Sequence, residues 1–136
     1  MIDELDAAVE LTVSLCLRFE GLRLSPYLCP AGIPTIGCGS THYLDGRAVQ
    51  ITDPPIARDA AISLCRETVR RLYQRNTIAS CPGIDTPRRL AALTDFTYNL
   101  GARALRASTL RKRVNAGRWQ DVPGELVKWV RGGGAR

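Results

Sequence analysis

The 136-residue sequence contains no apolar run of the ~20 residues that a transmembrane helix needs. Its beginning lacks the basic and then apolar pattern of a secretory signal peptide, because acidic residues stand there instead: Asp3, Glu4, Asp6 and Glu10. Internal repeats and low-complexity tracts are absent as well. We therefore expect synthesis in the cytoplasm without an export signal of the chain's own.

Paired cysteine motifs are missing too. The five cysteines are odd in number, show no CxxC spacing and come without a secretory context, so we expect most of them to be reduced and buried. The single histidine, His42, could pair with Cys29 in a cysteine hydrolase, but no third, orienting group is visible. The same two residues with Cys38 match no known zinc spacing, so we expect no metal and no other cofactor.

The apolar residues that are present suffice for one core. With 45% hydrophobic residues, the chain is long enough for one modest domain and too short for two ordinary ones. Its net charge of +6 is uneven: from Thr86 onward there are 11 Lys and Arg against 3 Asp and Glu, whereas the first 85 residues carry 8 against 10. Such a basic half suggests a polyanionic partner, for which nucleic acid, anionic cell-wall polymer and lipopolysaccharide all qualify.

Periodicity and start signals predict a mainly helical chain with one small sheet. We expect a mostly buried helix from Asp3 to about Glu20, then a hairpin or three-stranded sheet, and a turn at Leu44-Asp45-Gly46. Proline and short polar residues mark the starts of the later helices. Their expected ranges are Thr52 or Asp53 to about Arg75, Thr86 to Leu100, Ser108 to Gly117, and Asp121 to Trp129.

The most informative stretch runs from Phe19 to Ser40 and reads FEGLRLSPYLCPAGIPTIGCGS. Glu20 ends the first helix, where unpaired carbonyls disfavour a carboxylate anion, so it is a candidate general acid. Eight residues separate Glu20 from Cys29, and five separate Cys29 from Thr35. A hairpin could bring the thiol and the hydroxyl back over the helix end, so that all three groups face one cleft.

This combination resembles the active-site segment of the phage-type lysozymes, or endolysins, of glycoside hydrolase family 24. Their pattern is Glu, eight residues, Asp or Cys, five residues and Thr, with a TIG-x-G motif beginning at that Thr. A second similarity to the family is LTDFTYNL at residues 93–100, with Gly101, Ser108-Thr109-Leu110 and Trp129 after it. The resemblance covers nearly the whole chain. It implies a single α+β, lysozyme-like domain over residues 1–136, with a small β lobe at about 20–50, a helical part at 1–19 and 51–136, and a cleft between them.

The resemblance also implies a function, namely hydrolysis of the β-1,4 bond between N-acetylmuramic acid and N-acetylglucosamine in peptidoglycan, for lysis of a bacterial host by a phage or prophage. Glu20 would protonate the leaving oxygen, while Cys29 and Thr35 would manage the attacking water with inversion at the anomeric carbon. Asn99 would contact the substrate, although an amide that bonds the carbonyls of a helix end explains it equally well. The protein would be a monomer that stays in the host cytoplasm until it is released to the periplasm and cell wall.

Two departures from the family pattern affect stability more than chemistry. Ser40 stands where the family usually has histidine, so a polar link between the lobes is lost or replaced. The further basic helix that normally follows Trp129 is missing from this sequence, which leaves apolar surface without its usual cover.

Two alternatives from other classes stay open. The chain could be a catalytically impaired, truncated endolysin that only binds cell wall or membrane through its basic helices. A nucleic-acid module would explain the charge, but no recognition motif is evident, so we expect no nucleic acid as partner and an anionic envelope surface instead.

Overall fold

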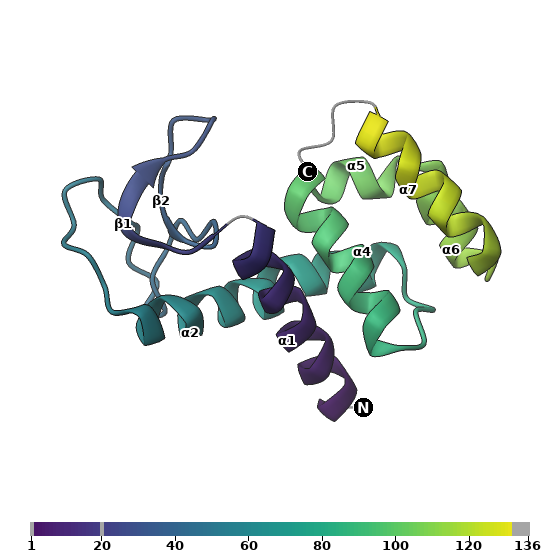
Figure 1. Cartoon of the computed structure of the whole chain (residues 1–136), viewed down its shortest axis with the longest axis horizontal. Coiled ribbons are helices and arrows are strands. Elements are labelled where there is room, and N and C mark those ends of the chain that lie inside the picture. Colours follow the sequence, from purple (N-terminus) through teal and green to yellow (C-terminus); the bar gives the residue numbers. More distant parts are fainter. Residues whose placement is uncertain (1, 20, 132–136) are drawn as a thin grey trace.

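A two-stranded hairpin and a cluster of helices lie at opposite ends of a long connecting helix (Figure 1). The computed structural model describes the backbone of residues 2–19 and 21–131, and the side chains of residues 4–19 and 21–129. Glu20, the expected general acid, lies outside the described residues. The mixed architecture, with one small antiparallel sheet and several helices, confirms the predicted fold class.

The first helix, α1 (Ile2–Phe19), packs against the connecting helix and against α4 (Pro87–Leu100). It ends as predicted, because Gly21 has φ 78° and donates its N–H to the Cys16 carbonyl at 3.2 Å. The expectation that α1 is mostly buried is wrong. Only one face is covered, and Phe19 is 55% exposed. The buried side chains of that face are Ala8, Val9, Thr12, Val13 and Cys16.

The sheet is the predicted hairpin and not a three-stranded sheet within the described residues. Strands β1 (Arg23–Leu28) and β2 (Pro34–Gly37) pair antiparallel, with Tyr27 opposite Thr35. The tight turn between them uses Gly32, which has φ 78° and donates to the Cys29 carbonyl at 2.8 Å. A side chain would be strained at that φ, so glycine is required here.

The connecting helix starts later than predicted. Its first part, α2 (Arg58–Thr68), begins after Pro54 and Pro55, which lie in the preceding loop. The reason is that the carboxylate of Asp53 accepts hydrogen bonds from residues of that loop and does not cap a helix. It accepts from the Tyr43 hydroxyl at 2.8 Å, from the Gln50 N–H at 2.9 Å and from the Arg47 guanidinium.

The connecting helix also runs further than its apolar periodicity indicates. After α2 it passes through a π-helical segment, η1 (Val69–Gln74), and continues as α3 (Arg75–Ser80) to the predicted break at Cys81-Pro82-Gly83. The buried face of this part of the helix carries polar residues, so a search for periodic apolar residues does not detect it. Thr77 Oγ1 lies 2.7 Å from Thr97 Oγ1 of α4, and Gln74 donates to the Leu5 carbonyl of α1 at 3.0 Å.

The remaining helices form the larger core. Helix α4 has the predicted cap, since Thr86 accepts from the Arg89 N–H, and it ends at Gly101 with φ 96°. A short helix α5 (Ala102–Arg106) was not predicted. Helix α6 (Thr109–Asn115), with its Ser108 cap, the 3₁₀ turn η2 (Trp119–Asp121) and α7 (Val122–Arg131) follow close to the predicted positions. Their shared core contains Cys81, Leu93, Phe96, Leu105, Leu110, Val114 and Val122.

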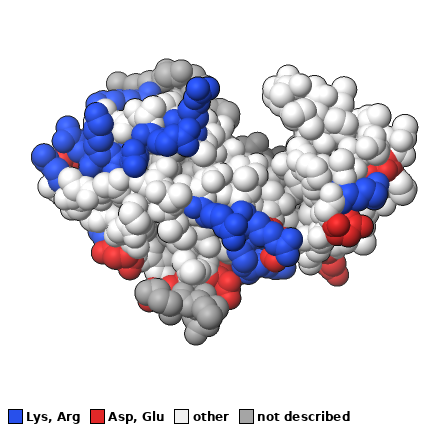
Figure 2. Space-filling view, turned by 180° about the vertical axis from the view of Figure 1, so that it is seen from behind, with Lys and Arg blue, Asp and Glu red and all other residues white. Residues whose placement is uncertain are grey.

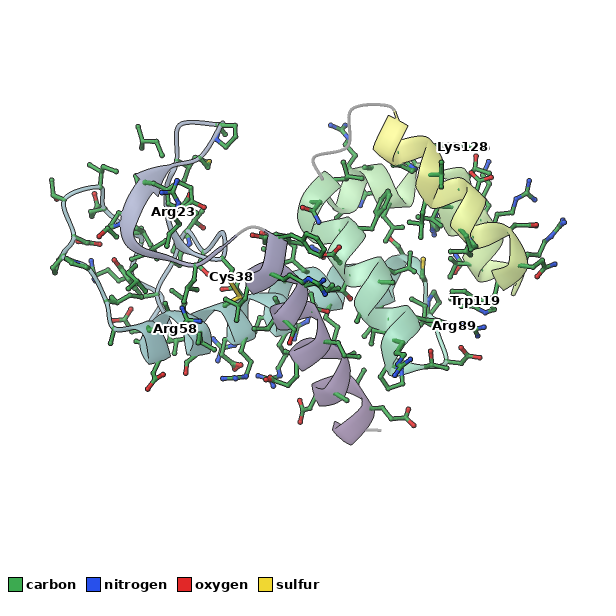
Figure 3. All side chains as sticks on the ribbon, viewed as in Figure 1. Arg23, Cys38, Arg58, Arg89, Trp119 and Lys128 are labelled. Carbon is green, nitrogen blue, oxygen red and sulfur yellow. A yellow bond between two sulfur atoms is a disulfide. The ribbon has the colours of Figure 1, made fainter. Side chains whose placement is uncertain are left out.

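A disulfide between Cys38 and Cys65 ties the segment after β2 to α2. Figure 3 shows Cys38 where the hairpin segment meets the connecting helix. The prediction of reduced cysteines is therefore wrong for this pair, because spacing in the sequence does not reveal that residues 27 positions apart lie together. Cys16 and Cys81 are buried, and Cys29 is half-buried.

No helix within the described residues is both long and apolar enough to cross a membrane.

The disulfide gives a stability prediction. Replacing both Cys38 and Cys65 with alanine should lower the free energy of unfolding by about 3 kcal/mol, because the cross-link restricts the unfolded chain. Thermal unfolding with and without reductant measures the effect. Reductant should lower the melting temperature of the wild type and leave that of the double variant unchanged. An unchanged wild-type melting temperature would contradict the prediction.

Candidate active site

A cleft of about 380 Å³ lies between the hairpin and α4. Three of the four predicted site residues, Cys29, Thr35 and Asn99, line it together, although Asn99 is 64 positions beyond Thr35 in the chain. The other lining residues are Tyr27, Gly39, Thr41, Tyr73 and Tyr98. The fold thus assembles one polar cleft from the hairpin, the connecting helix and α4.

The segment from Thr35 to Thr41 forms one wall of this cleft. The chain turns at Cys38 and Gly39, so that Ile36 and Ser40 exchange two backbone hydrogen bonds of 2.9 Å. Thr35, Gly39 and Thr41 line the cleft. The residues between them face α2: Ile36 packs in a core cluster with Leu64, Cys38 is bonded to Cys65, and Ser40 Oγ lies 2.6 Å from Thr68 Oγ1. The wall is therefore fixed from behind by one face of α2.

The Ser40–Thr68 hydrogen bond shows what replaces the polar link that the family's histidine at this position implied. A polar link to the connecting helix is present, but it joins two hydroxyl groups.

Cys29 sits at the hairpin turn, one residue beyond the end of β1. Its backbone N–H donates to the Ile33 carbonyl at 3.1 Å, which places the half-buried thiol at the edge of the cleft. Hydrogen bonding from the backbone of Ile33 lowers the pKa of this thiol, partial desolvation opposes the shift, and the backbone of Ala31 and the Thr35 hydroxyl add to the lowering. Cys29 is thus a thiol with increased thiolate character that opens to the cleft.

Thr35 is buried, and its hydroxyl donates to the Ile33 carbonyl at 2.8 Å. A hydroxyl carries one proton, so in this arrangement its oxygen is an acceptor towards the cleft. To donate to the Cys29 thiolate, the hydroxyl must turn away from Ile33. Thr35 can therefore either accept from a water molecule or support the thiolate.

Asn99 is half-buried near the end of α4. Its amide nitrogen donates to the Asp95 carbonyl at 2.9 Å, one helical turn back. This bond matches the structural alternative for Asn99, yet the residue also lines the cleft. Both roles are compatible, because the bond uses the amide nitrogen and leaves the amide oxygen to accept from a ligand.

Sequence reasoning missed the tyrosines of the cleft. Tyr98 packs against the buried cluster that includes Cys16, Cys38 and Cys65 and also lines the cleft. Its ring meets that of Tyr73 edge to face, with centroids 5.1 Å apart. Burial raises the pKa of Tyr73, so its hydroxyl stays protonated and can donate.

Gly39 lies directly against this tyrosine pair. A Cβ at this position would stand 3.4 Å from the Tyr98 ring, and the φ of 92° disfavours any side chain. The glycine spacing of TIG-x-G was the one available sign of a close approach here, but it does not say what approaches.

The structure offers no support for a metal site from the residues weighed above. Cys38 is held in the disulfide, and in the described part of the chain no three His, Cys, Asp or Glu side chains cluster. His42 is exposed, with Nδ1 3.0 Å from the Thr41 hydroxyl.

The hairpin, the helical cluster and the polar cleft between them define an α+β, lysozyme-like protein. The chain belongs to the phage lysozyme family, whose model matches residues 17–136. It is 34% identical to an endolysin of Acyrthosiphon pisum secondary endosymbiont phage 1, over 85% of this chain and 74% of that protein.

Solved structures agree with this assignment. The endolysin from Escherichia coli O157:H7 phage FAHEc1 is 30% identical, with a TM-score of 0.72 over 88% of this chain and 73% of that one. The muramidase domain of SpmX from Asticaccaulis excentricus is 26% identical, with a TM-score of 0.66 over 87% of this chain and 76% of that one. The lysozyme-like fold predicted from the sequence is confirmed.

The lowered pKa of Cys29 gives a pH prediction. Because the thiolate is the reactive form, the alkylation rate of Cys29 by iodoacetamide should reach half its maximum at a pH below the ~8.5 of an ordinary thiol. Thr35→Val removes a group that lowers this pKa and should move the midpoint upward. Mass spectrometry identifies the labelled residue, and Cys29→Ser is the unlabelled control. A midpoint at or above the ordinary value would refute the assignment.

Proposed function

We propose that this chain is a peptidoglycan hydrolase that cleaves the β-1,4 bond between N-acetylmuramic acid and N-acetylglucosamine during lysis of a bacterial host. Its membership of the phage lysozyme family supports a lysozyme-type glycoside hydrolase. The observation that carries the proposal is the meeting of Cys29, Thr35 and Asn99 in one cleft. Residues 1–136 act as one domain whose hairpin and helical parts supply opposite walls of that cleft.

Glycoside hydrolysis with inversion needs an acid on the leaving oxygen and a base that activates water on the opposite face of the sugar. Glu20 is the acid in our proposal. Cys29, as thiolate, takes a proton from the water molecule, the water oxygen bonds to the anomeric carbon, and the glycosidic bond breaks as Glu20 protonates the leaving oxygen. Thr35 accepts a hydrogen bond from the water molecule and so orients the lone pair of the water oxygen towards the anomeric carbon.

A thiolate is a stronger base than the carboxylate that many relatives carry, but an ordinary thiol is mostly protonated at neutral pH, which is why a lowered pKa of Cys29 favours this role. The hydrogen bonds from the turn raise the fraction of thiolate at neutral pH. Asn99 binds the sugar from the opposite wall through its amide oxygen. The acid, base and water perform the reaction by proton transfer, so the proposed mechanism includes no cofactor.

A turbidity assay on permeabilised Gram-negative cells tests this mechanism. Glu20→Gln should reduce lysis by about 10²- to 10⁴-fold, the usual worth of a general acid. Cys29→Ala should also abolish most activity, whereas Cys29→Asp should retain part of it, because a carboxylate can serve as the base. New reducing ends should accompany clearing.

Glu4→Gln is the matched control, since Glu4 is an exposed carboxylate of α1 away from the cleft. Equal clearing by wild type and Glu20→Gln without new reducing ends would instead identify a membrane-active or wall-binding protein. The absence of clearing by a folded wild type would favour the impaired, truncated endolysin.

The basic helices are proposed as the surface that meets the anionic envelope. Between Ala102 and Arg118 there are six Lys and Arg and no Asp or Glu. Figure 2 shows basic side chains gathered over the end of the molecule that α5, α6 and α7 form. Four of them make no ion pair within the described part of the chain: Arg103, Arg106, Lys112 and Arg113.

This surface supports retention of the released monomer on the cell wall by charge. Arg111 differs from its neighbours, because it donates to the carbonyls of Ser80 at 2.9 Å and Arg106 at 3.2 Å and so joins α6 to the end of α3. It is therefore excluded from the test of binding.

Changing Arg103, Arg106, Lys112 and Arg113 together to glutamine should weaken sedimentation with isolated cell walls about tenfold at low salt and leave the hydrolysis of soluble fragments unchanged. Arg58→Gln with Arg75→Gln, which removes exposed charge elsewhere, should bind like the wild type. Loss of binding that is equal in both variants would show that net charge and not this surface is responsible. Preferential binding of DNA would favour the nucleic-acid alternative.

A further inference from the structure

A second cavity adjoins the catalytic cleft. It has a volume of about 200 Å³ and lies between the loop of residues 39–44 and the face of the connecting helix at residues 64–72. Gly39 and Thr41 line both this cavity and the cleft, so only the thin chain segment 39–41 separates them. A ligand bound in the cleft therefore has a side pocket immediately beside it.

The walls of the side pocket are partly apolar and open to solvent. Leu44 is 50% exposed and Leu72 is 47% exposed. Both are large apolar side chains that line the pocket, Leu44 from the loop and Leu72 from η1. Tyr43 also lines the pocket, but the Arg47 guanidinium covers one face of its ring at 4.4 Å. That face is not free to stack on a sugar.

Two charged side chains line the pocket, Glu67 and Arg71. Glu67 accepts a hydrogen bond from Arg70 of the same helix, and Arg71 forms a looser ion pair with its other carboxylate oxygen at 3.8 Å. At that distance Arg71 makes no hydrogen bond with Glu67, and it makes none with any other side chain or carbonyl in the described part of the chain. Its side chain is 64% exposed, so the planar set of N–H donors is available to a ligand.

We propose that this side pocket binds the peptide stem of peptidoglycan, with Arg71 pairing to a stem carboxylate and Leu44 and Leu72 contacting its short apolar side chains. The assignment rests on the proposed function, because the stem is attached to the same glycan strand that the cleft would hold. A stem offers free carboxylates together with methyl side chains, and an Arg fork pairs with carboxylates through two parallel hydrogen bonds. N-acetylglucosamine is neutral and offers Arg71 no such partner, and the lactyl carboxyl group of N-acetylmuramic acid is a neutral amide wherever a stem is attached.

The pocket then makes Arg71 a specificity-determining residue. Glycan strands that carry stems gain binding from the pocket, while strands without stems use the cleft alone. Because the carboxylate lies far from the scissile bond, the contact exists equally in the ground state and in the transition state. It should lower KM and leave kcat unchanged.

The test compares Arg71→Gln with wild type on intact glycan strands and on strands whose stems an amidase has removed and whose lactyl carboxylates, exposed by that cleavage, have been converted to amides. The variant should raise KM about tenfold on stem-bearing strands, as expected for loss of a hydrogen-bonded charge pair, and should match the wild type on stem-free strands. Arg71→Lys should restore part of the difference. Arg75→Gln, one turn further on and outside the pocket, is the control and should behave like the wild type.

A binding experiment separates this inference from the proposed hydrolase function. A synthetic stem peptide titrated into the labelled protein should shift the NMR signals of residues 39–44 and 64–72, and Arg71→Gln should abolish the shifts. If the wild type cleaves no glycan but the peptide still binds at Arg71, the hydrolase function fails and the pocket assignment stands. If cleavage proceeds but Arg71→Gln changes both substrates alike, changes neither, or leaves peptide binding intact, the pocket assignment is overturned.

Discussion

The packing of residues 36–40 against α2 is the contact on which the rest of the site depends. Ile36, Cys38 and Ser40 each meet a residue of α2, through apolar packing, a disulfide and a hydrogen bond respectively. Gly39, which lines the cleft, belongs to this segment and is held in place by these contacts. Three different kinds of interaction support one short wall, and none of them ionises in the folded protein, since Ser40 and Thr68 link through neutral hydroxyl groups. The geometry of the wall should therefore vary little with pH.

Local chemistry was enough to predict much of the fold. Thr86 with Pro87, Ser108 and Gly101 mark helix ends within a few residues of sequence, and the structure uses them as caps and stops. The hairpin was equally visible, because the turn needs only the glycine at residue 32. The start of α2 was misjudged because Asp53 bonds partners as far away as Tyr43, which no local pattern reveals.

The candidate site was predictable to the extent that one segment contains it. Cys29 and Thr35 belong to the same hairpin, so their spacing already implied proximity. The disulfide partner of Cys38 and the pair of Tyr73 and Tyr98 could not be found in that way, because each needs segments about 25 or more residues apart to meet. Asn99 was found only through a family resemblance, and its amide nitrogen bonds within α4, which leaves the amide oxygen for the proposed contact with substrate.

The π-helical segment has a consequence for how the connecting helix can serve both ends of the molecule. Each residue advances an α-helix by about 100°, so one additional residue in a wide turn rotates everything after it by that angle. Before the segment, the helix presents Leu64 and Cys65 to the hairpin; after it, Thr77 meets α4. The π-helical segment thus changes the direction in which the helix faces, from the hairpin before it to α4 after it. Tyr73 lies in this segment and lines the cleft between the hairpin and α4.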